Sequence, residues 1–257
     1  MESILDSPFA LNGKKILVTG ASSGIGRQCA IRCSLSGATV IISGRDENRL
    51  QETLEMLNPA ADHSKYIGDL CDFDNLETLV SDIIHCCGKI DGLISSIGYE
   101  ITLPIHIMKP KDYQSLFNTN VISGFELTRQ LIKKNGLNSK SSLVFIASIM
   151  GIVGQIGIIG YCSSKGALIS GVRAMALELV SNGIRVNSIL PAVCNTPMTE
   201  KLFSKLSNEK VQEIIKMHPL GLGDTDDVAL AAVYLLSEAS KWVTGSSLIV
   251  DGGYSAH

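Results

Sequence analysis

The chain has 257 residues, of which 45% are hydrophobic and 18% are charged, and its formal net charge is −3 at pH 7. This composition is typical of a compact globular protein, and the lack of basic runs argues against nucleic-acid binding. No stretch reaches the ~20 consecutive apolar residues of a membrane span. We therefore expect a cytoplasmic protein with no nucleic-acid or membrane partner.

Short apolar runs alternate with longer helical patterns along the chain. The expected strands are Lys15–Thr19, Thr39–Ser43, Lys65–Gly68, Gly92–Ser95, Leu143–Ser148, Arg185–Leu190 and Ser247–Val250. The expected helices are residues 25–36, 46–57, 74–87, 111–134, 161–181, 199–216 and 226–238. Apolar strands separated by helices indicate an α/β fold, a Rossmann-type doubly wound parallel sheet of about seven strands with helices on both faces.

No glycine- or proline-rich linker divides the chain, so we expect residues 1–257 to form a single domain. Residues 195–223 look like an insertion that covers the substrate, although a plain packing helix is an alternative. The five histidines are scattered, so no metal site is expected. The seven cysteines form no Cys-x-x-Cys pair and are expected to be free thiols, with a redox switch at the adjacent Cys86 and Cys87 as the alternative.

A glycine-rich turn follows the first strand. It reads Thr19-Gly-Ala-Ser-Ser-Gly-Ile-Gly26 and leads into the helix expected over 25–36. Glycines let backbone amides approach a pyrophosphate, and the helix N-terminus adds partial positive charge. This context predicts a dinucleotide site rather than a merely structural turn. Its expected contact residues are Gly20, Ser22, Ser23, Gly24, Ile25 and Gly26.

The end of the second strand bears on which dinucleotide is bound. Gly44 occupies the position where NAD sites usually place an acidic residue, and Arg45 follows it. A guanidinium suits a 2′-phosphate, so NADP is predicted and NAD is less favoured. A register error of one residue would put Asp46 there and reverse this interpretation, and Arg45 would then be a solvated charge.

The third strand ends in a second candidate contact. A carboxylate at Asp69 can accept a hydrogen bond from the adenine amino group, and Leu70 follows it. The alternative for Asp69 is a cap of the next helix, for which Asp72 is the better candidate.

Tyr161 and Lys165 are four residues apart in an expected helix, so they lie on the same face one turn apart. An ordinary tyrosine loses its proton near pH ~10, and a fixed cation beside it lowers that pKa. Lowering it by about three pH units would take roughly 4 kcal/mol and would make the phenol a proton donor or acceptor near neutral pH. Beside a dinucleotide site, such a group indicates hydride transfer to or from a carbonyl.

Together these motifs resemble the short-chain dehydrogenase/reductase family, over about residues 13–253. The overall pattern is most similar to the 3-oxoacyl-[acyl-carrier-protein] reductase-like branch. The resemblance is carried by the glycine turn, Asn120, Ser148, the Tyr161-x-x-x-Lys165 pair and the segment Thr244–Gly253.

The resemblance implies roles for single residues. Tyr161 would be the general acid in reduction and the base in oxidation, and Lys165 would lower its pKa and hold the nicotinamide ribose. Ser148 would hydrogen-bond the substrate carbonyl oxygen. Asn120 would support a water chain to Lys165, with Asn118 as the competing choice.

The resemblance implies two further cofactor contacts, and this sequence departs from the family pattern at two places. Thr196 would bind the nicotinamide carboxamide, and Gly98 would admit the adenosine ribose. The fourth strand usually ends Asn-Asn-Ala-Gly, but here it reads Ser95-Ser-Ile-Gly98. The usual Pro-Gly after the sixth strand is Pro191-Ala192, and alanine restricts positive φ, so another loop path is expected there.

We therefore predict an NADP-dependent oxidoreductase that interconverts a ketone and a secondary alcohol, with a 3-oxoacyl thioester as the leading substrate. The apolar, glycine-rich loop over 151–160 also suits a steroid or another small alcohol. The alternatives from other classes are a catalytically silent dinucleotide-binding regulator and a nucleotide-sugar epimerase, for which the C-terminal region is short. Family relatives are commonly tetramers, so a homotetramer or homodimer is expected.

Overall fold

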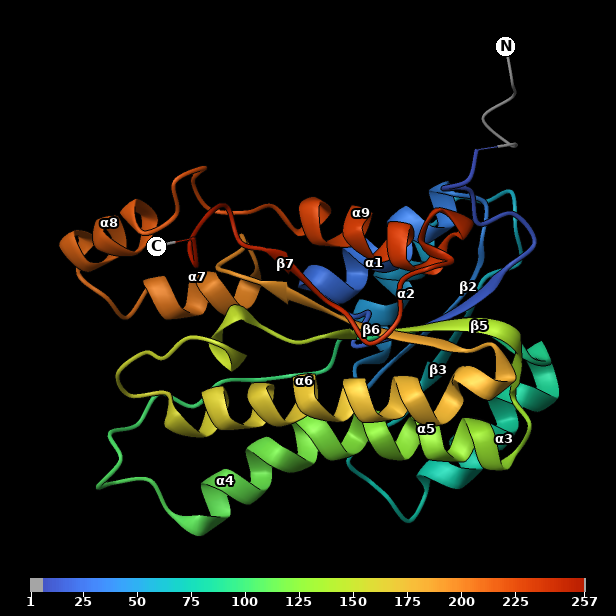
Figure 1. The fold of residues 1–257 in the computed structure, drawn as a ribbon, viewed down its shortest axis with the longest axis horizontal. Helices are drawn as coiled ribbons and strands as arrows, with labels where there is room; N and C mark the ends of the chain where they lie inside the picture. The colour runs from blue at the N-terminus through green and yellow to red at the C-terminus, as the bar shows by residue number, and fades with distance from the viewer. Residues whose placement is uncertain (1–6, 257) are drawn as a thin grey trace.

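The computed structural model describes residues 7–256, which are built around one parallel sheet of seven strands. The strand order is β3-β2-β1-β4-β5-β6-β7, so the winding reverses between β1 and β4 (Figure 1). This is the doubly wound arrangement predicted from the sequence, and such sheets bind ligands at the carboxyl ends of the strands beside the reversal. The strands are β1 Lys15–Thr19, β2 Thr39–Gly44, β3 Ser64–Ile67, β4 Ile90–Ser95, β5 Leu137–Ile146, β6 Arg185–Pro191 and β7 Ser247–Val250.

Helices cover both faces of the sheet (Figure 1). One face carries α1 (Gly24–Leu35), α2 (Glu47–Glu55) and α9 (Thr225–Leu236). The other face carries α3 (Leu76–Cys87), α5 (Ser123–Lys133) and α6 (Ile159–Leu179). Three shorter helices, α4 (Pro110–Phe117), α7 (Pro197–Phe203) and α8 (Asn208–Lys216), lie towards the left end of the molecule in Figure 1.

The strand sequences explain the two apolar cores. Successive side chains of a strand point to opposite faces, so a strand buried on both faces is apolar throughout. In β1, Leu17 packs into the core under α3, α5 and α6, whereas Ile16 and Val18 pack into the core under α1 and α9. All three side chains are fully buried, which fixes β1 in the middle of the sheet.

Two long expected helices are interrupted. The helix expected over 111–134 consists of α4 and α5 joined by a π-helical turn, Asn118–Ile122. The helix expected over 199–216 is two helices, because the Ser207 hydroxyl accepts a hydrogen bond from the backbone N of Lys210 and so caps a new start at α8. The sequence pattern alone did not separate these pieces.

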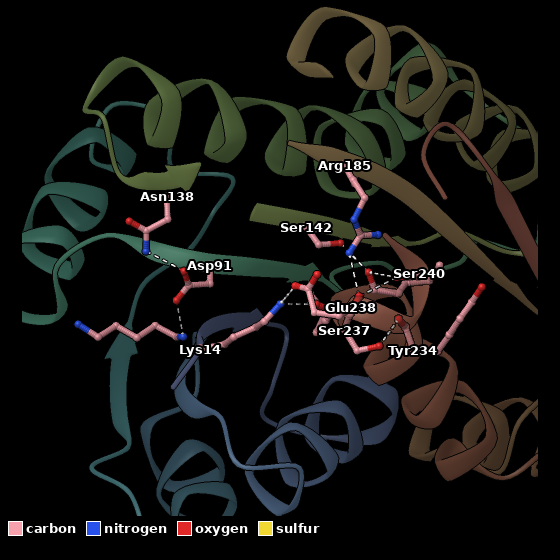
Figure 2. Close-up of polar contacts among 12 residues, drawn as sticks. Lys14, Asp91, Asn138, Ser142, Arg185, Tyr234, Ser237, Glu238 and Ser240 are labelled. Carbon is pink, nitrogen blue, oxygen red and sulfur yellow. Dashed lines mark hydrogen bonds and ion pairs between the residues drawn. The ribbon is translucent and has the colours of Figure 1, made fainter. Parts of the chain in front are cut away.

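A network of polar contacts ties together the amino ends of the strands (Figure 2). Asp91 Oδ2 accepts a hydrogen bond from the backbone N of Lys15 at 2.8 Å, and its Oδ1 accepts one from Asn138 Nδ2 at 2.7 Å. Asp91 thereby joins β4 to both of its neighbours, β1 and β5. At the start of β6, Arg185 Nη2 donates to the carbonyl oxygen of Ser237 at 3.3 Å. The network braces the edge of the sheet opposite the expected ligand edge.

Replacing Asp91 with alanine is expected to lower the free energy of unfolding by about 1–3 kcal/mol, because two part-buried donors lose their acceptor. Turnover per folded molecule should stay unchanged, since the network lies at the far edge of the sheet. Urea denaturation of Asp91→Ala measures the first effect. The exposed Asp62→Ala serves as the control and should change stability by less than about 0.5 kcal/mol.

Within residues 7–256, no helix is long and apolar enough to cross a membrane. All seven cysteines are free. No group of three or more histidine, cysteine or acidic side chains among the described residues could hold a metal ion.

Candidate active site

The glycine turn between β1 and α1 leaves its backbone accessible. Gly20 has a φ of +67°, and a Cβ placed on it would lie 2.6 Å from the carbonyl oxygen of Ser96. A Cβ on Gly26 would overlap the carbonyl oxygen of Gly20. Ser23 precedes α1 without a side-chain capping hydrogen bond, and the first turn of α1 carries no acidic residue. The first amides of α1 therefore remain available to an anion, which fits the pyrophosphate of a dinucleotide.

The end of β2 presents a guanidinium to solvent. The Arg45 side chain is 78% exposed and lies 3.7 Å from a carboxylate oxygen of Asp69, a loose ion pair. Asp46 is engaged elsewhere, because its Oδ1 accepts a hydrogen bond from the backbone N of Arg49 at 3.1 Å and caps α2. Asp46 is thus committed to a helix end, and Arg45 is the charge available beside the strand end.

The expected cap at Asp72 is wrong. Asn75 precedes α3 as its N-cap residue, and Asp72 Oδ2 instead accepts a hydrogen bond from Asn75 Nδ2 at 2.8 Å. Asp69 Oδ1 accepts from the backbone N of Cys71 at 2.9 Å, which stabilises the turn after β3. The carboxylate of Asp69 therefore serves both this turn and the ion pair with Arg45.

Arg27 is a residue that the sequence analysis missed. Its guanidinium donates to the carbonyl oxygen of Ser22 at 2.8 Å and to Glu52 Oε2 at 2.9 Å. Its Nε is buried and has no partner among the described residues. The signal was its position directly after Gly26, which puts a second cation beside the glycine turn.

Among the other predicted cofactor contacts, Ser22 would use its side chain, whereas Ile25 and Leu70 would use their backbone groups. Ser22 lies beside β2, because a Cβ on Gly44 would be 3.6 Å from Ser22 Oγ. Ile25 and Leu70 pack their side chains into the two cores, which leaves their backbone groups for a ligand.

Thr196 lies across from the glycine turn. A Cβ on Gly24 would be 3.5 Å from Thr196 Cγ2, so the start of α7 faces the start of α1. Thr196 Oγ1 accepts a hydrogen bond from the backbone N of Thr199 at 3.2 Å, and Pro197 occupies the first helical position. The predicted nicotinamide contact is therefore held at the ligand edge by a helix cap.

Tyr161 and Lys165 come together near the end of β5. The Lys165 side chain is buried, and its Nζ donates to the carbonyl oxygen of Ile146 at 2.9 Å. The same Nζ lies 5.7 Å from the centroid of the Tyr161 ring. Ser148 is buried two residues after β5 and forms a hydrogen bond with Tyr161. A Cβ on Gly98 would lie 3.2 Å from Lys165 Nζ, so a glycine here leaves the ammonium more room than any other residue would.

The pKa of Tyr161 is shifted in the direction opposite to the one expected from the sequence. Burial raises the pKa of Tyr161 above its ordinary value of 10.0, and the hydrogen bond with Ser148 acts against this rise. Burial also lowers the pKa of Lys165 from 10.5 to about 8. The net shift of the Tyr161 pKa is therefore upward in this structure, and the lowering by Lys165 stays a prediction. The reason is that the ammonium is directed to the Ile146 carbonyl while the phenol loses its solvent.

Asn120 lies in the π-helical turn and is buried, whereas the competing Asn118 is exposed. Asn120 Oδ1 accepts from the backbone N of Tyr99 at 3.0 Å, and Nδ2 donates to the Tyr99 carbonyl oxygen at 3.1 Å and to Ser164 Oγ at 2.9 Å. Both amide protons thus hold the segment after β4 against α6, and Oδ1 keeps one lone pair for a further donor. Single π turns within α-helices are frequent at functional sites.

The two departures from the family pattern are accommodated by packing. Ser95 is buried, and a Cβ on Gly124 would lie 2.9 Å from Ser95 Oγ, so the small hydroxyl lets α5 approach β4 closely. The only non-glycine residues with positive φ within 7–256 are Asn135 and Lys140. Ala192 is not among them, and its N donates to the Val250 carbonyl oxygen at 3.2 Å. Ala192 thus continues the pairing of β6 with β7 without positive φ, and a loop path different from the family's stays a prediction.

Comparisons with known proteins agree with this geometry. Residues 20–255 match the family model described as Enoyl-(Acyl carrier protein) reductase. The chain is 36% identical over 246 residues to the 3-oxoacyl-[acyl-carrier-protein] reductase FabG of Rickettsia felis, which covers 95% of this chain and 97% of that protein. It is 33% identical over 252 residues to the glucose 1-dehydrogenase of Gluconobacter oxydans, which covers 95% of this chain and 93% of that protein.

A solved structure extends the similarity to the whole fold. It is a proposed NAD(P)-dependent gluconate 5-dehydrogenase from Beutenbergia cavernae with bound NADP at low occupancy. The TM-score is 0.89 at 27% sequence identity, over 98% of this chain and 100% of that chain. The family binds a nicotinamide dinucleotide. The chain therefore belongs to the short-chain dehydrogenase/reductase family, close to its 3-oxoacyl-[acyl-carrier-protein] reductases, and is an oxidoreductase that acts on CH–OH and C=O groups.

Proposed function

We propose that this chain is an NADP-dependent reductase that interconverts a ketone and a secondary alcohol, with 3-oxoacyl thioesters as the leading substrate class. One observation carries the proposal. Ser148, Tyr161 and Lys165 converge at the carboxyl end of β5, next to the segment that follows β4. A proton donor, a hydrogen-bond donor and a cation together suit a carbonyl oxygen that gains negative charge.

Each of these residues has a proposed part in the reduction. The Tyr161 hydroxyl gives its proton to the carbonyl oxygen and takes it back in the oxidation. The Ser148 hydroxyl donates a hydrogen bond to the same oxygen and holds it beside the phenol. The Lys165 ammonium stabilises the phenolate that remains, and Asn120 positions the segment after β4 and supports a water chain to Lys165. The nicotinamide, when bound, gives or receives the hydride.

NADP is the proposed cofactor. The exposed Arg45 supports a site for a 2′-phosphate beside β2. The glycine turn holds the pyrophosphate, Asp69 and Leu70 contact the adenine, Gly98 admits the ribose, and Thr196 binds the carboxamide. Each of these assignments rests on the position of the residue at the ligand edge.

Replacing Arg45 with serine is expected to weaken NADPH binding by about 10–100-fold, because hydrogen bonds to a charged group contribute about 1.5–3 kcal/mol. NADH binding should change less than about twofold, since NADH has no 2′-phosphate to lose. Fluorescence titration of both cofactors against both proteins measures the difference. If both cofactors weaken equally, the assignment to NADP fails.

The substrate proposal rests on an apolar entrance. Before Tyr161, Ile152 and Ile156 are 49% and 97% exposed, and residues 195–223 expose Met198 and Leu220 at 51% and 88%. We propose that residues 195–223 cover an acyl chain with these side chains. A panel of 3-oxoacyl thioesters, steroid ketones and sugars, followed at the nicotinamide absorbance with both cofactors, tests the class. Preference for steroid or sugar substrates would replace the acyl assignment with another alcohol dehydrogenase activity.

The proposed assembly is a homotetramer or homodimer in the cytoplasm. Ile132 on α5, Leu177 on α6 and Val180 just after α6 are exposed and apolar. The two helices run side by side (Figure 1). Exposed apolar residues of this kind suit contact with a second copy of the chain. Sedimentation velocity with Leu177→Glu against the wild type tests the assignment.

A further inference from the structure

The segment that follows β4 runs beside the loop that leads to Tyr161, and we take it as one wall of the proposed substrate site. The backbone N of Leu103 donates to the Gly157 carbonyl oxygen at 2.7 Å, and a Cβ on Gly157 would lie 3.4 Å from Thr102 Cγ2. On its other side, Tyr99 is held by the amide of Asn120. The segment is therefore fixed between the π-helical turn and the loop that leads to Tyr161.

Glu100 lies on this wall and is partly buried. Its Oε1 accepts a hydrogen bond from Thr102 Oγ1 at 3.0 Å, and within residues 7–256 it forms no ion pair. Glu100 follows Gly98 by two residues, and a Cβ on Gly98 would lie 3.2 Å from Lys165 Nζ, so this carboxylate lies near the proposed catalytic centre. After burial, its negative charge also raises the pKa of Tyr161. The facing loop over 150–160 contains no charged residue that could offset it.

We propose that Glu100 sets the charge preference of the substrate site, so that neutral ketones and alcohols are admitted and ketones or alcohols that also carry a carboxylate are rejected. The inference rests on the proposed function, because it concerns the substrate of the same site. A partly buried carboxylate without a cationic partner repels a second carboxylate across a low-dielectric site. It leaves a neutral thioester or ester unaffected.

The other charges around Tyr161 do not explain such a preference. The Lys165 ammonium is directed to the Ile146 carbonyl oxygen and would attract an anion rather than repel it. The Cys162 thiol raises the pKa of Tyr161 less than Glu100 does, and it follows Tyr161 on α6. Replacing Glu100 with a neutral residue removes a negative charge that opposes Lys165 at this site.

Matched neutral and anionic ketones test the proposal with NADPH. One pair is the N-acetylcysteamine thioester of acetoacetate against acetoacetate, and the other is cyclohexanone against 4-oxocyclohexanecarboxylate. The wild type should prefer the neutral member of each pair in kcat/KM. Glu100→Gln should reduce this preference by about tenfold, chiefly through faster turnover of the anion. Glu55→Gln makes the same charge change on α2, away from the site, and should leave the preference as it is.

A second readout does not depend on turnover. Ionisation of Tyr161 is followed by the ultraviolet absorbance of the phenolate with saturating NADP, with Tyr161→Phe subtracted. At each pH the ionised fraction should be larger in Glu100→Gln than in the wild type, because a negative neighbour has been removed. Added salt should shrink the difference in charge preference between the two proteins.

The outcomes separate this inference from the proposed function. Turnover of cyclohexanone without turnover of the thioester would reject the acyl assignment. The comparison of cyclohexanone with 4-oxocyclohexanecarboxylate would still test the role of Glu100. If no compound is turned over, the proposed function is wrong, and the titration of Tyr161 in the two proteins tests the role of Glu100 by itself. An unchanged titration, or an unchanged preference in Glu100→Gln, overturns the inference.

Discussion

Tyr161→Phe is expected to lower kcat by about 10²–10⁴-fold, the usual contribution of a positioned general acid. The hydroxyl is the only group that this substitution removes, so the ring should keep its packing between Ser148 and Lys165. Affinity for NADPH should change less than about twofold. Stopped-flow measurement of a single turnover, together with a fluorescence titration of NADPH, separates loss of chemistry from loss of binding.

Tyr234→Phe on α9 provides the matched control, because this tyrosine lies at the opposite edge of the sheet in the network of Figure 2. It should keep the kcat of the wild type. If Tyr161→Phe turned over substrate like this control, the proton donor would be another group. If it retained a cellular role without turnover, the role of a dinucleotide-binding regulator would be supported.

Lys165→Met is expected to abolish turnover and at the same time to stabilise the fold near neutral pH. Burial lowers the pKa of Lys165 from 10.5 to about 8, which means that the folded protein bears a cost for the charged ammonium. The difference corresponds to about 3 kcal/mol at pH values below 8. Loss of the hydrogen bond to the Ile146 carbonyl offsets about 1 kcal/mol of this gain.

The dependence on pH gives the sharper test of Lys165. Between pH 8 and 10.5 the unfolded chain binds the lysine proton and the folded chain has released it, so the stability of the wild type rises with pH in this window. The advantage of Lys165→Met should therefore shrink as the pH rises from 7 to 10. Guanidinium denaturation of both proteins at several pH values measures it, with the exposed Lys241→Met as control. A constant difference across this range would contradict a buried, charged Lys165.

Much of the fold could be predicted from the sequence because strand and helix patterns have different periods. All seven expected strands exist, and their order follows from the right-handed crossovers of a parallel sheet. Glycines that need positive φ or close approach, such as Gly20, mark the phosphate turn without any knowledge of the fold. The enzyme class follows from the spacing of Tyr161 and Lys165 together with this turn.

Other features depend on contacts that a linear pattern does not contain. Arg27 was missed, because its contact with the Ser22 carbonyl is formed only in the fold. Ala192 looked like a poor fit, yet its pairing with Val250 removes any need for positive φ. The pKa of Tyr161 depends on how much solvent reaches the phenol, which the spacing to Lys165 does not reveal. The assigned roles of the site residues stay predictions until the variants are measured.

The π-helical turn Asn118–Ile122 limits which insertions and deletions the helical region from Pro110 to Lys133 can accept. An α-helix advances about 100° per residue, so removal of one residue from the turn would rotate everything on one side of it by that angle. Either Leu127 and Leu131 of α5 would leave the core, or the amide of Asn120 would swing away from Tyr99. Single-residue insertions and deletions between Pro110 and Lys133 should therefore be absent from active variants, whereas substitutions on the exposed face should be tolerated.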